Sequence, residues 1–102
     1  TFQHLDLRTG KILECRKVEG SDKLLVSLVD LGEGKPRSIV SGVAEFYQPE
    51  ELPGTNVIVV ANLKPVKFRG ERSEGMILAT DDGKSIKILE APEGSVPGTI
   101  VR

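Results

Sequence analysis

Residues 56–80, NVIVVANLKPVKFRGERSEGMILAT, contain two apolar runs separated by a basic stretch. The first run, residues 56–62, has four consecutive Val and Ile residues, a composition typical of a strand buried on both faces. The second run, residues 75–80, predicts another strand. Between them, the nine residues from Lys64 to Arg72 carry four cations and one acid, Glu71, in a chain whose net charge is −1. The segment therefore predicts two strands joined by a basic loop.

The rest of the chain also has apolar patterns that are typical of strands, with Gly, Pro and acidic turns between them. Apolar and polar residues alternate over residues 5–18, whereas the near-continuous Val and Leu of residues 24–31 predict a strand with much of both faces buried. We predict further strands over residues 5–18, 24–31, 38–41 and 86–89. The long first strand contains Gly10, where we expect a bulge or a sharp coil of the backbone. Residues 42–54 have the apolar spacing of a short helix, with Pro49 at the first position of its second turn.

This order of elements predicts an all-β fold. Several short strands at spacings of roughly ten residues, with one short helix between the third and fourth, are typical of a five-stranded Greek-key barrel of the oligonucleotide-binding type, the OB-fold. Small additional elements follow at the C-terminal end. At 102 residues the chain is long enough for one core, so we assign residues 1–102 to a single domain. The chain has three Phe, one Tyr and no Trp, so we expect an aliphatic core.

The sequence also indicates a cellular compartment. No apolar run approaches the roughly 18 to 20 residues needed to cross a bilayer, and no secretory leader opens the sequence. The one cysteine, Cys15, cannot form an internal disulfide, which fits a reducing compartment. We therefore expect a cytoplasmic protein.

The residues that catalysis or metal binding would need are scarce. His4 is the one histidine and Cys15 the one thiol, and nothing in the sequence brings them together as base and nucleophile. One His and one Cys make no metal-ligand set, and the acidic pairs Glu50-Glu51 and Asp81-Asp82 are typical of solvated turns. Residues 32–36, GEGKP, lack the spacing of a nucleotide-binding loop and predict a hairpin turn. We therefore predict no catalytic site, no cofactor and no metal.

The basic loop is the strongest candidate for a functional site. Pro65 and Gly70 bracket its cations and give the loop a defined path. Ammonium and guanidinium groups can thus be held at the fixed spacing that phosphate contacts require. A solvated charged loop is the alternative, because the chain as a whole is slightly acidic.

Groups that could recognise bases flank the basic loop. Asn62, Ser73 and Glu74 offer uncharged donors and a carboxylate to base edges or sugar hydroxyls. Phe68 and Met76 could pack against an unstacked base. The alternatives are a core anchor for Phe68 and ordinary barrel packing for Met76.

Seven ordered motifs, spread over essentially the whole chain, closely resemble the tRNA-binding domain family. They are Phe2-x-x-Leu5-Asp6-Leu7-Arg8-Thr9-Gly10-Lys11-Ile12, Ser21-Asp22-Lys23-Leu24, Val29-Asp30-Leu31-Gly32, Ile39-Val40-Ser41-Gly42, Tyr47-x-Pro49-Glu50-Glu51-Leu52, Ala61-Asn62-Leu63-Lys64-Pro65 and Ser73-Glu74-Gly75-Met76. This family is found in the C-terminal extension of methionyl-tRNA synthetases, in stand-alone bacterial tRNA-binding proteins and in eukaryotic synthetase-associated cofactors.

The resemblance implies an OB-fold barrel that binds tRNA by its shape and phosphate backbone, with little sequence preference. It also implies a non-catalytic module that assists an aminoacyl-tRNA synthetase in cis or in trans. Bacterial members of the family tend to be homodimers and some eukaryotic extensions are monomers, and we expect a homodimer here. Family positions implicated in RNA contact correspond here to Asn62, Lys64, Lys67, Arg69, Ser73, Glu74 and Met76. Relatives often have Gln where this chain has Glu74, so we expect its carboxylate to accept a hydrogen bond from a base amine, a 2′-hydroxyl or a neighbouring cation. The alternative is a chaperone-like or assembly homodimer that binds peptides or proteins, which other relatives with this barrel resemble.

Overall fold

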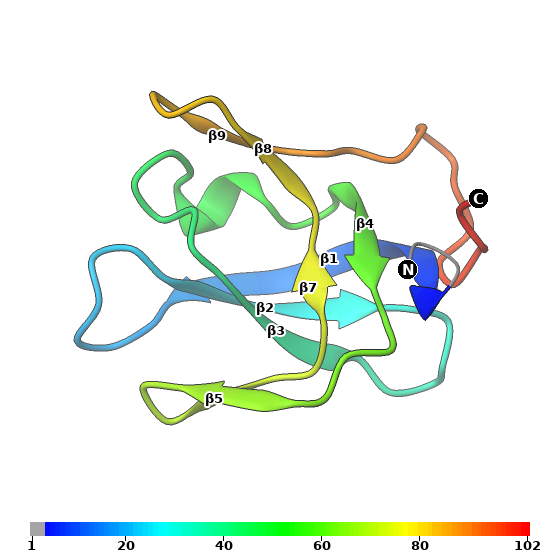
Figure 1. Ribbon diagram of the computed structural model, residues 1–102, viewed down its shortest axis with the longest axis horizontal. Helices are drawn as coiled ribbons and strands as arrows, with labels where there is room; N and C mark the ends of the chain where they lie inside the picture. The colour runs from blue at the N-terminus through cyan, green and yellow to red at the C-terminus, as the bar shows by residue number, and fades with distance from the viewer. Residues whose placement is uncertain (1–3) are drawn as a thin grey trace.

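An antiparallel sheet of five strands, curled into a nearly closed barrel, forms the body of the protein (Figure 1). The computed structural model describes residues 4–102. In space the strands follow the order β3-β2-β1-β4-β7. Their bounds are Leu7–Lys17 for β1, Leu25–Asp30 for β2, Arg37–Ser41 for β3, Asn56–Val60 for β4 and Met76–Ile77 for β7. The predicted all-β, five-stranded barrel of the OB type is confirmed.

Two hairpins extend from the barrel. β5 (Val66–Phe68) and β6 (Glu71–Ser73) pair within the connection between β4 and β7. β8 (Ala79–Asp81) and β9 (Ile86–Ile88) pair after β7 and supply the predicted C-terminal elements. The hairpins lie on opposite sides of the barrel, with β5 at the bottom of Figure 1 and β8 and β9 at the top.

Aliphatic side chains fill the barrel. Inward-facing residues of neighbouring strands lie opposite one another, as in the Ile12–Val29 and Ser27–Ile39 pairs. Because successive residues of a strand point to opposite faces, the alternating pattern of the sequence places one apolar set inside. The buried apolar side chains among residues 4–102 are all Ile, Leu, Val or Ala, which confirms the predicted aliphatic core.

The predicted bulge at Gly10 is wrong. β1 passes through Gly10 in regular register with β4, and the shift in its pairing with β2 lies between Ile12 and Glu14. Gly10 instead allows close packing, because a Cβ at this position would lie 2.7 Å from Val29 Cγ1 and 2.8 Å from Leu31 Cδ2. The bulge therefore falls where β1 leaves β4 and continues along β2, and a bulge increases the local twist that curls a sheet.

The segment predicted as a short helix, residues 42–54, contains two short turns. In the first, Val43 O accepts the N–H groups of Phe46 and Tyr47 at 2.9 and 3.0 Å, and a 3-10 turn follows it. This 3-10 turn, η2, spans Pro49–Glu51, and Glu51 accepts the backbone N–H of Gln48 at 2.7 Å. Pro49 has no N–H with which to extend the helix backwards, and Pro53 stops it in the forward direction. The predicted place of the helix, between the third and fourth barrel strands, is confirmed, whereas the helix is shorter than expected. No helix in the described part of the chain is long and apolar enough to cross a membrane.

The terminal segment, residues 96–101, lies along the first residues of β1. Gly98 donates its N–H to Thr9 O at 2.8 Å, and Val101 donates to Leu7 O at 2.9 Å. The Thr9 hydroxyl also donates to Val96 O at 2.8 Å. These bonds place the C-terminus beside the start of β1, at the end of the barrel opposite the tip of the β5–β6 hairpin (Figure 1).

Candidate nucleic-acid interface

The β5–β6 hairpin carries the basic segment of the sequence, and we call residues 64–73 the basic hairpin. Its turn consists of Arg69 and Gly70, whose φ angles are 49° and 83°. Two consecutive positive φ angles are required by the type I′ turn, whose twist matches that of paired strands. Gly70 adopts this conformation without steric cost, whereas Arg69 is the one non-glycine residue with positive φ among residues 4–102. The turn fixes Arg69 at the tip of the hairpin.

The cations of the basic hairpin face solvent. Lys64, Lys67, Arg69 and Arg72 are all exposed. Lys67 and Arg72 lie directly opposite each other in the β5–β6 ladder, an arrangement in which like charges repel. The carboxylate of Glu74 is 3.8 Å from Arg72 Nε. An anion between Lys67 and Arg72 would relieve their repulsion, so the hairpin is suited to bind phosphate.

Two contacts place the basic hairpin beside the barrel. Arg16 of β1 donates to Glu71 of β6, with 3.0 Å between Nη2 and Oε1, and this hydrogen bond raises the pKa of Arg16. At the tip, Arg69 Nη1 lies near the β1–β2 turn, since a Cβ on Gly20 would be 3.8 Å from it. In OB-folds the loops between strands one and two and between strands four and five flank the ligand. The basic hairpin is the second of these loops.

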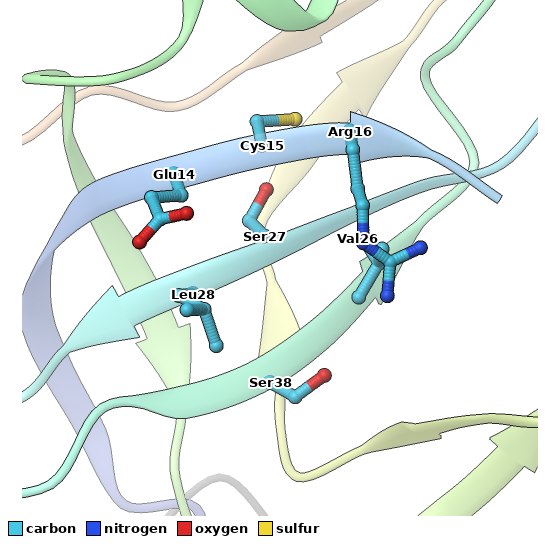
Figure 2. A pocket seen from close by; sticks show the side chains of 7 residues that line it. All are labelled: Glu14, Cys15, Arg16, Val26, Ser27, Leu28 and Ser38. Atoms are coloured by element: carbon cyan, nitrogen blue, oxygen red, sulfur yellow. The ribbon is translucent and has the colours of Figure 1, made fainter.

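A cavity of about 170 Å³ opens on the outer face of β1, β2 and β3 (Figure 2). Its lining includes Glu14 and Arg16 from β1, Leu28 from β2 and Ser38 from β3. Leu28 supplies apolar surface, while Glu14 and Arg16 contribute opposite charges. This surface was not predicted. The alternation along β1 and β2 could have assigned these residues to the outer face, but only the register of pairing brings them together.

Asn62 holds the start of the described chain against the barrel. Its Oδ1 accepts the N–H of Asp6 at 3.0 Å, and its Nδ2 donates to the carbonyl oxygen of His4. Both ends of the side-chain amide are thus engaged within the protein. Unlike the exposed cations of the basic hairpin, Asn62 fixes a segment of its own chain. Its predicted contact with RNA stays a prediction.

Ser73 and Glu74 lie where the basic hairpin joins the barrel. Ser73 is 5% exposed, and its hydroxyl donates to Gly75 O at 3.1 Å and accepts the N–H of Val40 at 3.0 Å. Glu74 accepts the N–H of Ser38 through Oε1 at 3.1 Å. Glu74 therefore has a structural partner that the sequence did not reveal. Direct contact of Ser73 and Glu74 with RNA stays a prediction.

Phe68 and Met76 present apolar surface to solvent. Phe68, on the basic hairpin, is 42% exposed, and Met76, at the start of β7, is 50% exposed. Phe68 is therefore not a core anchor, and that alternative is wrong. Met76 pairs with Val60 of β4, so it belongs to the barrel while half of it remains accessible. Phe68 can stack on an unpaired base, and Met76 can pack against one.

A second cavity, of about 350 Å³, lies near the terminal segment. Two ion pairs line it, Arg8 with Asp6 and Arg37 with Glu33, each at 2.8 Å. The hydrogen bond from Arg37 lowers the pKa of Glu33. Because each cation has a carboxylate partner, this cavity attracts phosphate less than the basic hairpin does. In the described part of the chain, no group of three or more His, Cys, Asp and Glu side chains is placed to hold a metal.

Known proteins are similar to this chain in both sequence and fold. The family model described as "Putative tRNA binding domain" matches residues 7–100. The methionine–tRNA ligase of Methanocella arvoryzae is 55% identical over 102 residues, which cover 99% of this chain and 15% of the ligase. The chain thus spans about 15% of the length of such relatives.

Solved structures extend the comparison. The MetRS related protein from Pyrococcus horikoshii has a TM-score of 0.92 at 33% identity, over 99% of this chain and 93% of that one. The chaperone CsaA from Bacillus anthracis has a TM-score of 0.89 at 24% identity, again over 99% and 93%, and this likeness concerns the fold alone. Since the family model covers residues 7–100 and the barrel matches a related protein at high similarity, this chain belongs to the tRNA-binding domain family.

Proposed function

We propose that this chain is a non-catalytic tRNA-binding module that recognises tRNA by its shape and phosphate backbone, with little sequence specificity. The observation that carries the proposal is the solvent-exposed basic hairpin, in a chain that belongs to a tRNA-binding family. The proposed RNA-binding residues are Asn62, Lys64, Lys67, Arg69, Ser73, Glu74 and Met76.

The cations of the basic hairpin supply most of the affinity in this proposal. Lys64, Lys67 and Arg69 neutralise phosphates and release condensed counterions, so binding weakens steeply as salt rises. The half-exposed Met76 packs against the face of an unpaired base. This contact tolerates any sequence because every base has such a face. The module therefore fixes the position of tRNA without reading much of its sequence.

The module assists an aminoacyl-tRNA synthetase, in cis or in trans, and leaves the chemistry to the synthetase. The relatives in which this domain forms about 15% of the chain are methionine–tRNA ligases. When attached to such an enzyme, even a weak site raises the effective concentration of tRNA at the catalytic domain. The unpaired Cys15 fits a cytoplasmic location for this work.

We also propose that the module is a homodimer. Three exposed apolar side chains lie on segments near the start of β1: Leu5 is 43% exposed, Val96 is 70% exposed and Ile100 is 52% exposed. Ile100 pairs with Arg8, which brings the terminal segment and the start of β1 together. An apolar surface of this kind is suited to a two-fold contact between copies. The tip of the basic hairpin lies at the other end of the barrel (Figure 1).

A titration with bulk tRNA and with a peptide library, each at two salt concentrations, tests the proposed function. We expect binding to tRNA at low salt and weaker binding at high salt. Replacing Lys64→Gln together with Arg69→Gln removes two phosphate contacts, and should flatten the slope of log affinity against log salt by about 1.4 to 1.8. The matched control, Lys35→Gln with Lys84→Gln, removes the same charge from exposed turns and should leave the affinity nearly unchanged.

The outcomes separate tRNA binding from the alternative, a chaperone-like or assembly homodimer that binds peptides or proteins. No tRNA binding at low salt, or unchanged binding by the hairpin variant, refutes the proposal. Tight binding that tolerates high salt refutes the phosphate-based mechanism. Binding of peptides without tRNA supports the chaperone-like alternative.

A further inference from the structure

The edge of β3 is completed by side chains. β3 is the terminal strand in the sheet order β3-β2-β1-β4-β7, and β2 pairs with one of its edges. On the other edge, the N–H of Ser38 donates to Glu74 Oε1 at 3.1 Å, and the N–H of Val40 donates to Ser73 Oγ at 3.0 Å. Glu74 also donates its backbone N–H to Ser38 O at 2.7 Å. Ser73 and Glu74 thus take the place of a neighbouring strand.

Arg37 joins the two chain segments that flank the basic hairpin. Its Nη1 donates to Ala61 O at 2.6 Å and to Glu74 O at 3.0 Å. Ala61 is where the chain leaves β4, and Glu74 is where it returns toward β7. The remaining contacts of the guanidinium go to Glu33, from Nε at 2.9 Å and from Nη2 at 2.8 Å. One side chain of β3 therefore holds together the segments that enter and leave the hairpin.

The hydrogen-bonding capacity of these side chains is largely used inside the protein. A serine hydroxyl has one donor, and that of Ser73 is given to Gly75 O in a site that is 5% exposed. Four N–H groups of Arg37 are engaged. Glu74 uses Oε1 for Ser38 and has Oε2 3.8 Å from Arg72. Arg37 and Ser73 therefore have little capacity left for RNA. Glu74 Oε2 can still accept a hydrogen bond, because 3.8 Å to Arg72 Nε is too long for one.

We propose that Arg37, Ser73 and Glu74 are positioning residues, which close the barrel along β3 and thereby hold the cations of the basic hairpin in the arrangement that binds phosphate. The inference rests on the proposed function and revises it for Ser73 and Glu74: these two residues act through the hairpin, in place of the direct contact with RNA proposed above. Glu74 has a second effect, because its carboxylate offsets the charge of Arg72.

Amide hydrogen exchange in the free protein tests the closure of the barrel without RNA. Ser73→Ala should lower the protection of the Val40 amide at least about tenfold and leave that of Ser38 nearly unchanged, whereas Glu74→Ala should do the reverse. Glu74→Gln is the matched control, since the amide oxygen of glutamine still accepts from Ser38, and it should retain protection. If neither amide loses protection in the alanine variants, the closure by side chains is refuted.

Binding of bulk tRNA tests the link between closure and function. Ser73→Ala removes no charge, yet misplaced cations should neutralise fewer phosphates, so the salt slope should flatten by about 0.7 to 0.9 for each phosphate that is no longer neutralised. Loss of a direct hydrogen bond would weaken binding without changing the slope. Glu74→Gln keeps the closure and removes a negative charge, so it should bind tRNA at least as tightly as the wild type.

A double-mutant cycle completes the test. The cycle compares the effect of Ser73→Ala on the affinity for bulk tRNA in two backgrounds, the wild type and a chain that carries Lys67→Gln and Arg69→Gln. A positioning residue should cost at least about fivefold in affinity in the wild type and less than about twofold once the cations are gone. An equal cost in both chains would identify Ser73 as a direct contact and overturn the proposal. Absence of tRNA binding by the wild type would overturn the proposed function as well, while the exchange experiment would still decide how the barrel closes.

Discussion

The ion pair between Arg16 and Glu71 leads to a prediction in which stability and binding change in opposite directions. The perturbation is Glu71→Gln, which removes the one acid among residues 64–72. The two side chains are 3.0 Å apart, and they are 62% and 26% exposed. Exposed pairs of this kind contribute about 0.2 to 1 kcal/mol, so the variant should unfold about 1 to 8 °C lower than the wild type.

The same substitution should strengthen tRNA binding. A carboxylate about 7 Å from a phosphate repels it by about 0.6 kcal/mol in water, and screening at 0.1 M salt reduces this to about 0.3 kcal/mol. With one or two phosphates near the hairpin, the variant should bind about 1.6- to 3-fold more tightly. Release of Arg16 from Glu71 adds a further cation to the same surface.

Fluorescence anisotropy with labelled bulk tRNA at 0.1 M salt measures this gain, and thermal unfolding followed by circular dichroism measures the loss of stability. Glu93→Gln, an exposed acid outside the basic hairpin, is the charge-matched control and should change neither quantity appreciably. The gain should disappear at about 0.5 M salt because the repulsion is screened. Weaker binding by Glu71→Gln at 0.1 M salt would refute the reasoning, and would mean that the ion pair serves mainly to orient the hairpin.

Three further predictions concern other parts of the fold. Gly32→Ala places a Cβ 2.6 Å from Pro97 O, whereas a Cβ in Gly34→Ala meets nothing within 4 Å at a similar positive φ. In urea unfolding, Gly32→Ala should therefore be less stable than Gly34→Ala by at least about 2 kcal/mol. Equal losses of stability would contradict the packing of the terminal segment. The pKa of Glu33 is lowered in the folded state from an ordinary value of 4.5. Its contribution to stability is therefore present above about pH 4.5 and is lost as the pH falls through the folded value. Glu33→Gln should weaken this loss of stability in acid, measured by unfolding at a series of pH values, and an unchanged loss would argue against the ion pair of Glu33 with Arg37. Burial raises the pKa of the half-buried Cys15 thiol. Iodoacetamide should therefore alkylate Cys15 at least about tenfold more slowly than free cysteine at pH 8, as followed by mass spectrometry. A rate equal to that of free cysteine would disprove the burial of Cys15.

The strands could be predicted because their signal is local. In β1 the alternation of apolar and polar residues indicates which face is buried. In β2 and β4 the near-continuous Val, Leu and Ile residues mark buried strands, and the aliphatic core follows from both patterns. The role of Gly10 could not be predicted in this way. Its packing against Val29 and Leu31 depends on how β1 lies against β2 and the residues that follow β2, which are about twenty positions away in the chain. The helix predicted over residues 42–54 is too long because the prediction gave more weight to apolar spacing than to Pro49 and Pro53, which limit the helix.

The cations of the candidate site could likewise be recognised from the sequence, since an exposed basic loop needs no distant partner to be exposed. The other proposed residues differ in this respect. Asn62 bonds to Asp6, 56 positions away, and Ser73 and Glu74 bond to β3, 33 and 36 positions away. Nothing near these residues in the chain reveals such partners. The sequence therefore marked them as functional candidates without showing what their polar atoms contact.

The terminal segment has a consequence for the order in which the barrel forms. The N–H of Thr99 donates to the Thr9 hydroxyl at 3.1 Å, which joins residues 90 positions apart. Bringing such distant residues together costs closure entropy before any packing compensates for it, and barrels rich in distant contacts fold in milliseconds to seconds. We therefore expect β1 to gain this last neighbour late, after β2 and β4 are in place. Conversely, release of the segment should be among the first steps of unfolding, with residues 7–9 the first part of β1 to lose a partner.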